Sequence, residues 1–162
     1  MRPALALDPA RRTTQYVTDV WTQDDGLPQN AVNAIAQTPD GYLWLGTEEG
    51  LVRFDGVRFT VFDRRTTPEI RNNFIMALHA DRAGDLWIGT FGGGLLRLRK
   101  GRFELFTEKD GLADGRIRSI PEGRGGAVWV APGGGGLVEF EKGRFSALTA
   151  KDGLASDRVW SV

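Results

Sequence analysis

Polar and aromatic side chains gather in the short segments that connect the apolar runs of this chain. Amides, carboxylates, guanidiniums and one aromatic ring together suit the hydroxyl groups and ring faces of a sugar or another polar small molecule. The alternative is that these positions are ordinary solvated loop tips. The candidate ligand-binding residues are Asn30, Glu48, Glu49, Arg71, Asn72, Asn73, Phe91, Asp114, Arg116, Asp157 and Arg158.

Residue types argue against a catalytic or metal centre. The chain has no cysteine and one histidine, His79, so it lacks the ligands for a thiolate or multi-histidine metal site. Glu48 and Glu49 are adjacent in a turn, and the sequence places no second acid for acid–base work. The glycine-rich stretches 89–94 and 132–136 lack the Lys-Ser or Lys-Thr of a phosphate loop, so we interpret them as turns. We expect no cofactor, no metal and no catalytic residue in this segment.

One sequence pattern occurs three times and must determine how those candidates are positioned. GYLWLGTEEGLVRFDGVRFTVF at 41–62 returns as GDLWIGTFGGGLLRLRKGRFELF at 84–106 and as GAVWVAPGGGGLVEFEKGRFSAL at 126–148. A period of about 42 residues indicates structural units that bury their apolar faces against neighbouring copies.

Each copy is predicted to form four short β-strands with almost no helix. Apolar segments of five to seven residues alternate with Gly, Asp and Pro turns, as in an all-β meander. The strand around each tryptophan is continuously apolar, which indicates cover on both faces. Small sheets covered on both faces and repeated at this period predict a β-propeller, with a β-sandwich or solenoid as the alternative. The residues expected to be structural are Trp44, Gly46, Leu51, Trp87, Gly89, Leu95, Trp129 and Leu137.

The register predicts three complete blades and partial strands at both ends. Residues 1–14 are expected to be a disordered stub or the remnant of a signal peptide, and 15–162 a partial propeller. Three blades do not close a ring, so we expect a fragment of a larger propeller whose open edges self-associate. The predicted blades are 31–63, 74–107 and 116–149, with an outer strand at 16–22 and the start of another blade at 158–162.

Topology predicts which loops lie together. Strands alternate in direction, so connections from a fourth strand to the next first strand share one end of the propeller with connections from second to third strands. We call this the loop end. The repeats diverge there, as 27–30, 70–73 and 112–116 show, and a varying surface on a repeating scaffold is typical of binding.

Charge and hydropathy limit the partners. The chain has 21 basic and 21 acidic side chains, and a formal charge of zero without a basic cluster argues against nucleic acid. It contains no long apolar run, so no membrane contact is expected in this segment.

The opening DGLPQN, the DG turn, LWLGT and the FDG turn resemble the two-component regulator propeller repeat over about residues 15–162. The second copy departs at its opening, and Ala131-Pro132 replaces Gly-Thr in the third.

The resemblance implies a periplasmic ligand-sensing propeller, seven-bladed when complete, in an inner-membrane-anchored receptor. Such receptors carry a membrane helix and a histidine kinase, hybrid kinase or diguanylate cyclase output downstream. The implied ligand is an oligosaccharide or another polar small molecule. A propeller lyase or hydrolase, and a protein-interaction scaffold, are the alternative functions.

Overall fold

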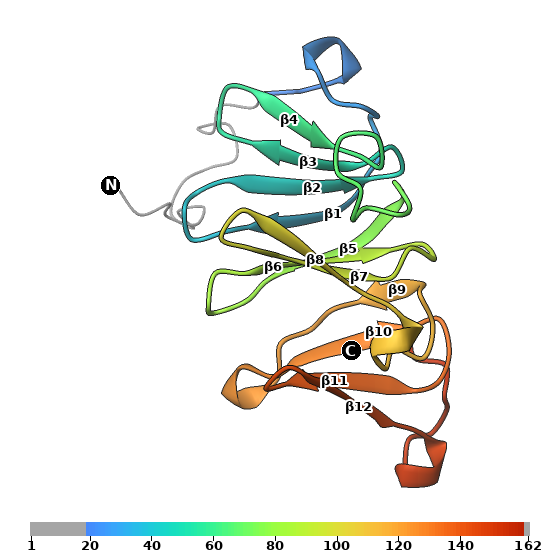
Figure 1. The fold of residues 1–162 in the computed structure, drawn as a ribbon. Coiled ribbons are helices and arrows are strands. Elements are labelled where there is room, and N and C mark those ends of the chain that lie inside the picture. Colours follow the sequence, from blue (N-terminus) through green and yellow to red (C-terminus); the bar gives the residue numbers. More distant parts are fainter. Residues whose placement is uncertain (1–18, 161–162) are drawn as a thin grey trace, which may run out of the picture.

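Three four-stranded antiparallel sheets make up the computed structural model, which describes residues 19–160 apart from the side chain of Arg124 (Figure 1). Strands pair in their chain order within each sheet, so each sheet is a meander, as predicted. Blade 1 contains β1 (Val32–Gln37), β2 (Leu43–Thr47), β3 (Leu51–Phe54) and β4 (Phe59–Phe62). Blade 2 contains β5 (Ile75–Ala80), β6 (Leu86–Thr90), β7 (Leu95–Arg99) and β8 (Arg102–Phe106). Blade 3 contains β9 (Ile117–Ser119), β10 (Val128–Pro132), β11 (Leu137–Glu141) and β12 (Arg144–Leu148).

The three blades follow one another side by side, from the blue-green sheet to the orange-red sheet in Figure 1. The first strands are neighbours, since β1 contacts β5 and β5 contacts β9. Every residue of β6 is buried, because blade 2 lies between two other blades. The predicted all-β propeller architecture is confirmed, and its core consists of the layers between blades.

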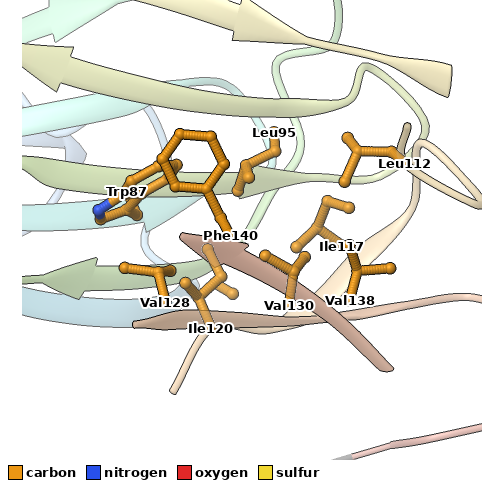
Figure 2. Packing of buried hydrophobic residues seen from close by; sticks show 10 residues of the cluster. Trp87, Leu95, Leu112, Ile117, Ile120, Val128, Val130, Val138 and Phe140 are labelled. Carbon is orange, nitrogen blue, oxygen red and sulfur yellow. The ribbon is translucent and has the colours of Figure 1, made fainter. Parts of the chain in front are cut away.

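Two apolar clusters fill those layers. Between blades 1 and 2, Trp44, Ile75 and Ile88 belong to one buried cluster. Between blades 2 and 3, Trp87 and Phe140 belong to a second buried cluster, together with aliphatic side chains such as Val128 (Figure 2). Each blade therefore depends on its neighbour to remove its apolar face from water.

In the first two repeats, a glycine lies two residues after the tryptophan. Close packing between blades explains why glycine is needed there. A Cβ on Gly46 would lie 2.8 Å from the Ile75 Cγ2, and one on Gly89 would lie 2.7 Å from the Ile117 Cγ2. Both distances are shorter than a carbon–carbon contact allows. These glycines admit the first strand of the next blade.

Three short 3₁₀ helices explain the recurring Asp-Gly-Leu: η2 (Gln23–Asp25), η3 (Glu108–Asp110) and η5 (Ala150–Asp152). In η3, Thr107 and Asp110 form a reciprocal capping box, and Gly111 ends the turn with a φ of 110°. Thr22 and Thr149 cap η2 and η5 in the same way. The motif is thus a loop-building device.

The connection that replaces this motif before blade 2 is organised by Asp63. Its buried carboxylate accepts hydrogen bonds from the Arg65 side chain and from the backbone N–H groups of Arg65 and Thr66. The Arg65 side chain contributes most to lowering the pKa of Asp63 from 3.8 to about 2, and the Thr66 N–H follows.

Asp63 is expected to make the fold acid-sensitive. Because its pKa is lower in the folded chain, its stabilisation is present above about pH 4 and is lost as the pH falls through about 2. Urea unfolding at about pH 5 and about pH 2.5 should show a smaller pH effect for Asp63→Asn than for the parent chain. An unchanged pH effect in Asp63→Asn would contradict this role.

The predicted end strands need correction. Residues 19–22 of the expected strand 16–22, and residues 158–160 of the expected strand 158–162, are not in strands. A strand requires a hydrogen-bonded partner, and no described residue pairs with either segment. Trp21 nevertheless packs on Phe54 at 5.0 Å between ring centroids. The predicted stub, 1–14, lies outside the described residues.

Two smaller features complete the fold. β10 pairs with the short β9 through a register shift between Ala131 and Pro132, where proline cannot donate to the ladder. A fourth 3₁₀ helix, η4 (Arg124–Gly126), precedes β10. Within residues 19–160, no helix has the length and hydropathy needed to cross a bilayer.

Candidate functional site

Hydrogen bonds between loops assemble the loop end. The Gln29 Oε1 accepts from the Glu48 N–H at 3.1 Å, which joins the two connections of blade 1. The Gly92 and Gly94 N–H groups both donate to the Gly115 carbonyl, at 3.1 and 3.0 Å. The fourth-to-first and second-to-third connections therefore lie together, on the right of Figure 1 where the η3 and η5 coils are drawn.

Three of the predicted candidates use an acceptor atom to close their own loops. The Oδ1 atoms of Asn30, Asn73 and Asp157 accept backbone N–H groups of Gln23, Arg64 and Ala150 at 2.8, 2.9 and 2.6 Å. These side chains occupy equivalent positions in three of the repeats, and Gly115 stands at that position before blade 3. Their first physical role is to shape the loops.

Asn72 and Phe91 form a small unit at the start of blade 2. The Asn72 amide donates to the Phe91 carbonyl and accepts from the Phe74 N–H. The rings of Phe74 and Phe91 lie 5.4 Å apart, and Phe91 is 43% exposed. An exposed aromatic ring held by its neighbours can stack against an apolar ligand face.

Arginines gather at the start of blade 3. Arg116 and Asp114 form an ion pair at 2.7 Å, and the Arg116 guanidinium lowers the pKa of the Asp114 carboxyl. The Arg118 guanidinium lies 4.1 Å from the Trp160 ring centroid. A hollow of about 260 Å³ is lined by Arg116, Arg118, Gly133, Arg158, Val159 and Trp160.

The remaining acidic candidates lie on another part of the loop end. Glu49 lines a separate open hollow with Gln29 and Arg65. Glu48 and Arg71 are exposed. The structure thus brings Asp114, Arg116 and Arg158 together, and it does not join them to Glu48 and Glu49 in one pocket.

Sequence reasoning missed Arg118 and Trp160, which complete the arginine-lined hollow. Each lies two residues after a predicted candidate, Arg116 and Arg158. Side chains two apart on an extended chain point to the same side, and this spacing is the signal that could have found them.

The expected structural residues lie mostly in the interior. Trp44 and Trp87 are 4% and 1% exposed, whereas Trp129 is half-buried. The Trp44 indole donates to the Thr38 hydroxyl at 3.0 Å. The other members of this set, Gly46, Leu51, Gly89, Leu95 and Leu137, are buried.

His79 lies at the boundary of blades 2 and 3, where sequence reasoning did not anticipate its acidic neighbour. Its Nε2 is 3.5 Å from the Glu122 Oε2, and the Arg82 Nε is 3.4 Å from the Glu122 Oε1. No group of three His, Cys, Asp or Glu that could hold a metal occurs among the described residues.

A family model described as two-component regulator propeller matches residues 26–49 and 69–92. Each match begins in the loop that precedes a blade, next to Leu27 or Ile70. It continues through the first strand of that blade to the tryptophan strand and the turn after it. The chain carries two-component regulator propeller repeats.

A histidine kinase of Formosa agariphila is similar to part of this chain. It is 39% identical to this chain over 65 residues, which cover 40% of the chain and 5% of the kinase. The chain therefore corresponds to a small part of that relative.

Solved structures support the propeller fold. The extracellular domain of a protein described as a hybrid two-component system from B. thetaiotaomicron superposes with a TM-score of 0.77 at 21% identity, covering 90% of this chain and 20% of that one. A second such domain gives 0.66 at 23% identity, over 78% and 19%. Virginiamycin B lyase from Staphylococcus aureus gives 0.60 at 14% identity, over 78% and 45%.

Proposed function

We propose that this chain is part of a ligand-sensing propeller in a two-component or diguanylate cyclase receptor. The propeller repeats and the likeness to extracellular domains of two-component systems support this role. A receptor of this kind places its propeller in the periplasm and its membrane anchor and output domain elsewhere in the protein.

The arginine-lined hollow at the loop end is the observation that supports ligand binding. Arg116, Arg118 and Arg158 line it together, and Trp160, which stacks on Arg118, is 70% exposed. Guanidiniums donate several hydrogen bonds in a fixed plane, and indole faces stack on sugar rings. We therefore propose an oligosaccharide or a similar polar small molecule as the ligand.

Signal transmission would require that the ligand stabilise one of two arrangements of the receptor. A ligand shifts such an equilibrium only by its difference in affinity for the two states. The blades are joined by loop contacts such as Gly92 to Gly115, so a ligand that bridges adjacent loops could select one blade spacing.

Calorimetric titration should test the hollow after a glycan-array screen of the purified chain. Arg158→Ala is expected to weaken binding of an array ligand by about tenfold, because a hydrogen bond from a charged donor is lost. Arg144→Ala, which removes an exposed arginine on β12 away from the hollow, serves as the matched control and should leave the affinity unchanged.

A protein pull-down and an assay for glycan cleavage, run beside the same screen, separate the alternative functions. Equal effects of Arg158→Ala and Arg144→Ala would contradict the proposed location. Retention of a protein partner with no glycan bound would favour the interaction scaffold. Cleavage of an array ligand by the chain would favour the lyase or hydrolase.

A further inference from the structure

Another hollow lies between blades 1 and 2, at the end opposite the loop end. Its volume is about 420 Å³, within the range of small-ligand sites. We call it the interblade hollow. It is lined by residues of both blades, including Tyr42, Arg53, Phe62, Asp85, Leu98 and Phe103.

The boundary between blades 2 and 3 shows how the corresponding space is filled there. Arg97 of blade 2 is equivalent to Arg53 of blade 1, because each pairs across the sheet with its repeat tryptophan. The Arg97 Nε donates to the Glu104 Oε2 at 2.9 Å. The Arg97 guanidinium also lies 5.5 Å from the Phe140 ring centroid. At this boundary the guanidinium has a carboxylate partner and an aromatic neighbour.

Among residues 19–160, Arg53 has neither the carboxylate partner nor an aromatic ring from the next blade within reach of its guanidinium. Thr60 stands opposite Arg53 on β4, where Glu104 stands opposite Arg97 on β8. Leu98 stands opposite Phe103, where Phe140 stands opposite Phe145. The smaller leucine leaves space, and the threonine supplies no charge.

Arg53 therefore faces the interblade hollow without an ion-pair partner among residues 19–160. Its guanidinium lies over Tyr42 at 4.6 Å and over Phe62 at 5.9 Å from the ring centroids. The side chain is half-buried, and a partly buried guanidinium without an acceptor gains strongly from one.

The other charged groups of the hollow leave a net positive lining. The Asp85 carboxylate is 3.4 Å from the Arg99 Nε, and the Asp40 carboxylate accepts from the Thr38 hydroxyl at 2.5 Å. The charged lining residues are Arg53, Arg99 and Lys100 against Asp40 and Asp85.

We propose that the interblade hollow binds a small carboxylate whose ring packs against the aromatic wall. The carboxylate would accept hydrogen bonds from the Arg53 guanidinium, as the Glu104 Oε2 does from the Arg97 Nε and Nη2. The ring would pack beside Phe62 and Phe103, whose centroids are 5.6 Å apart. Sugar acids and aromatic acids share this chemistry.

Calorimetry of the purified chain with two matched pairs of probes would test the carboxylate requirement. Galacturonate and galactose differ by the carboxylate on a sugar ring, and benzoate and benzyl alcohol differ by it on an aromatic ring. At least one acid should bind with an affinity about tenfold or more above that of its neutral match. Binding of galacturonate alone would indicate a sugar acid, and binding of benzoate alone an aromatic acid. Failure of both acids to bind, or equal binding of acid and neutral match, would overturn the proposal.

Variants that copy residues of the blade 2–3 boundary into the blade 1–2 boundary test the location of the site without truncating a side chain. Thr60→Glu supplies the missing carboxylate partner, and Leu98→Phe fills the space as Phe140 does. Both should weaken acid binding by about tenfold or more, with a melting temperature no lower than that of the parent chain. Arg53→Gln should weaken it equally, and Arg144→Gln on blade 3 should have no effect. Unchanged binding in Thr60→Glu and Leu98→Phe would overturn the assignment to the interblade hollow.

Discussion

Trp87→Ala is expected to lower the free energy of unfolding by about 3–5 kcal/mol, the usual range for truncating a buried large aromatic residue. Trp87 is 1% exposed, and its ring centroid lies 5.0 Å from that of Phe140 in the next blade. Its indole donates to the Asp81 Oδ2 at 2.8 Å. The substitution would open a cavity between blades 2 and 3 and leave that carboxylate without its indole donor. Urea unfolding followed by circular dichroism would measure the loss.

Two variants control for the chemistry of this change. Trp160→Ala removes the same side chain at a position that is 70% exposed, and its effect should stay within about 0.5 kcal/mol. Trp87→Phe keeps one aromatic ring but removes the indole donor and part of the buried volume, so its loss should be intermediate. If Trp87→Ala cost no more than Trp160→Ala, the tryptophan layer would not be the core of this fold.

Gly89→Val is expected to be strongly destabilising, by about 1–3 kcal/mol or more, because the added atoms have no space. A Cβ at Gly89 would lie 2.7 Å from the Ile117 Cγ2 and 3.1 Å from the Ile117 carbonyl oxygen. The backbone oxygen cannot rotate away, so β9 itself would have to move. Denaturant unfolding should show a lower midpoint.

Gly134→Val is the matched control, because a Cβ at Gly134 would meet no atom within 4 Å. Combining Gly89→Ala with Ile117→Ala gives a second test. Removing the isoleucine branches should make the double variant less destabilised than the sum of the single variants. Additive effects would show that contact with the Ile117 side chain is not the cause.

The repeat predicted most of the architecture because each copy contains its own turns and strands. The tryptophan strands, the glycine turns and the pairing of strands in chain order all follow from local patterns in 41–62 and its two copies. The end strands were predicted less well. Register alone placed 16–22 and 158–162 in strands, whereas a strand also needs a partner, and residues 19–22 and 158–160 have none in the described structure.

The candidate loop surface was only partly predictable. Topology correctly put the two sets of connections at one end, but it could not tell which side chains meet. Asn30, Asn73 and Asp157 proved to bind their own loop backbone, a role that depends on how each loop closes. Arg118 and Trp160 come into contact only when the segment at 158–160 lies beside β9.

The amino-acid sequence by itself determined the repeating unit, the four-stranded order within it and the need for each blade to pack on another. Those properties follow from residue types that lie close together in the sequence and from the regular spacing between the copies. Only the tertiary structure decided which guanidiniums share a hollow, and that Arg53 has no carboxylate acceptor among residues 19–160 whereas Arg97 has Glu104. The physical reason is that a cavity between blades depends on the sizes and charges of residues from two different copies, such as Thr60 and Leu98, whose distance along the chain says nothing of their contact in space.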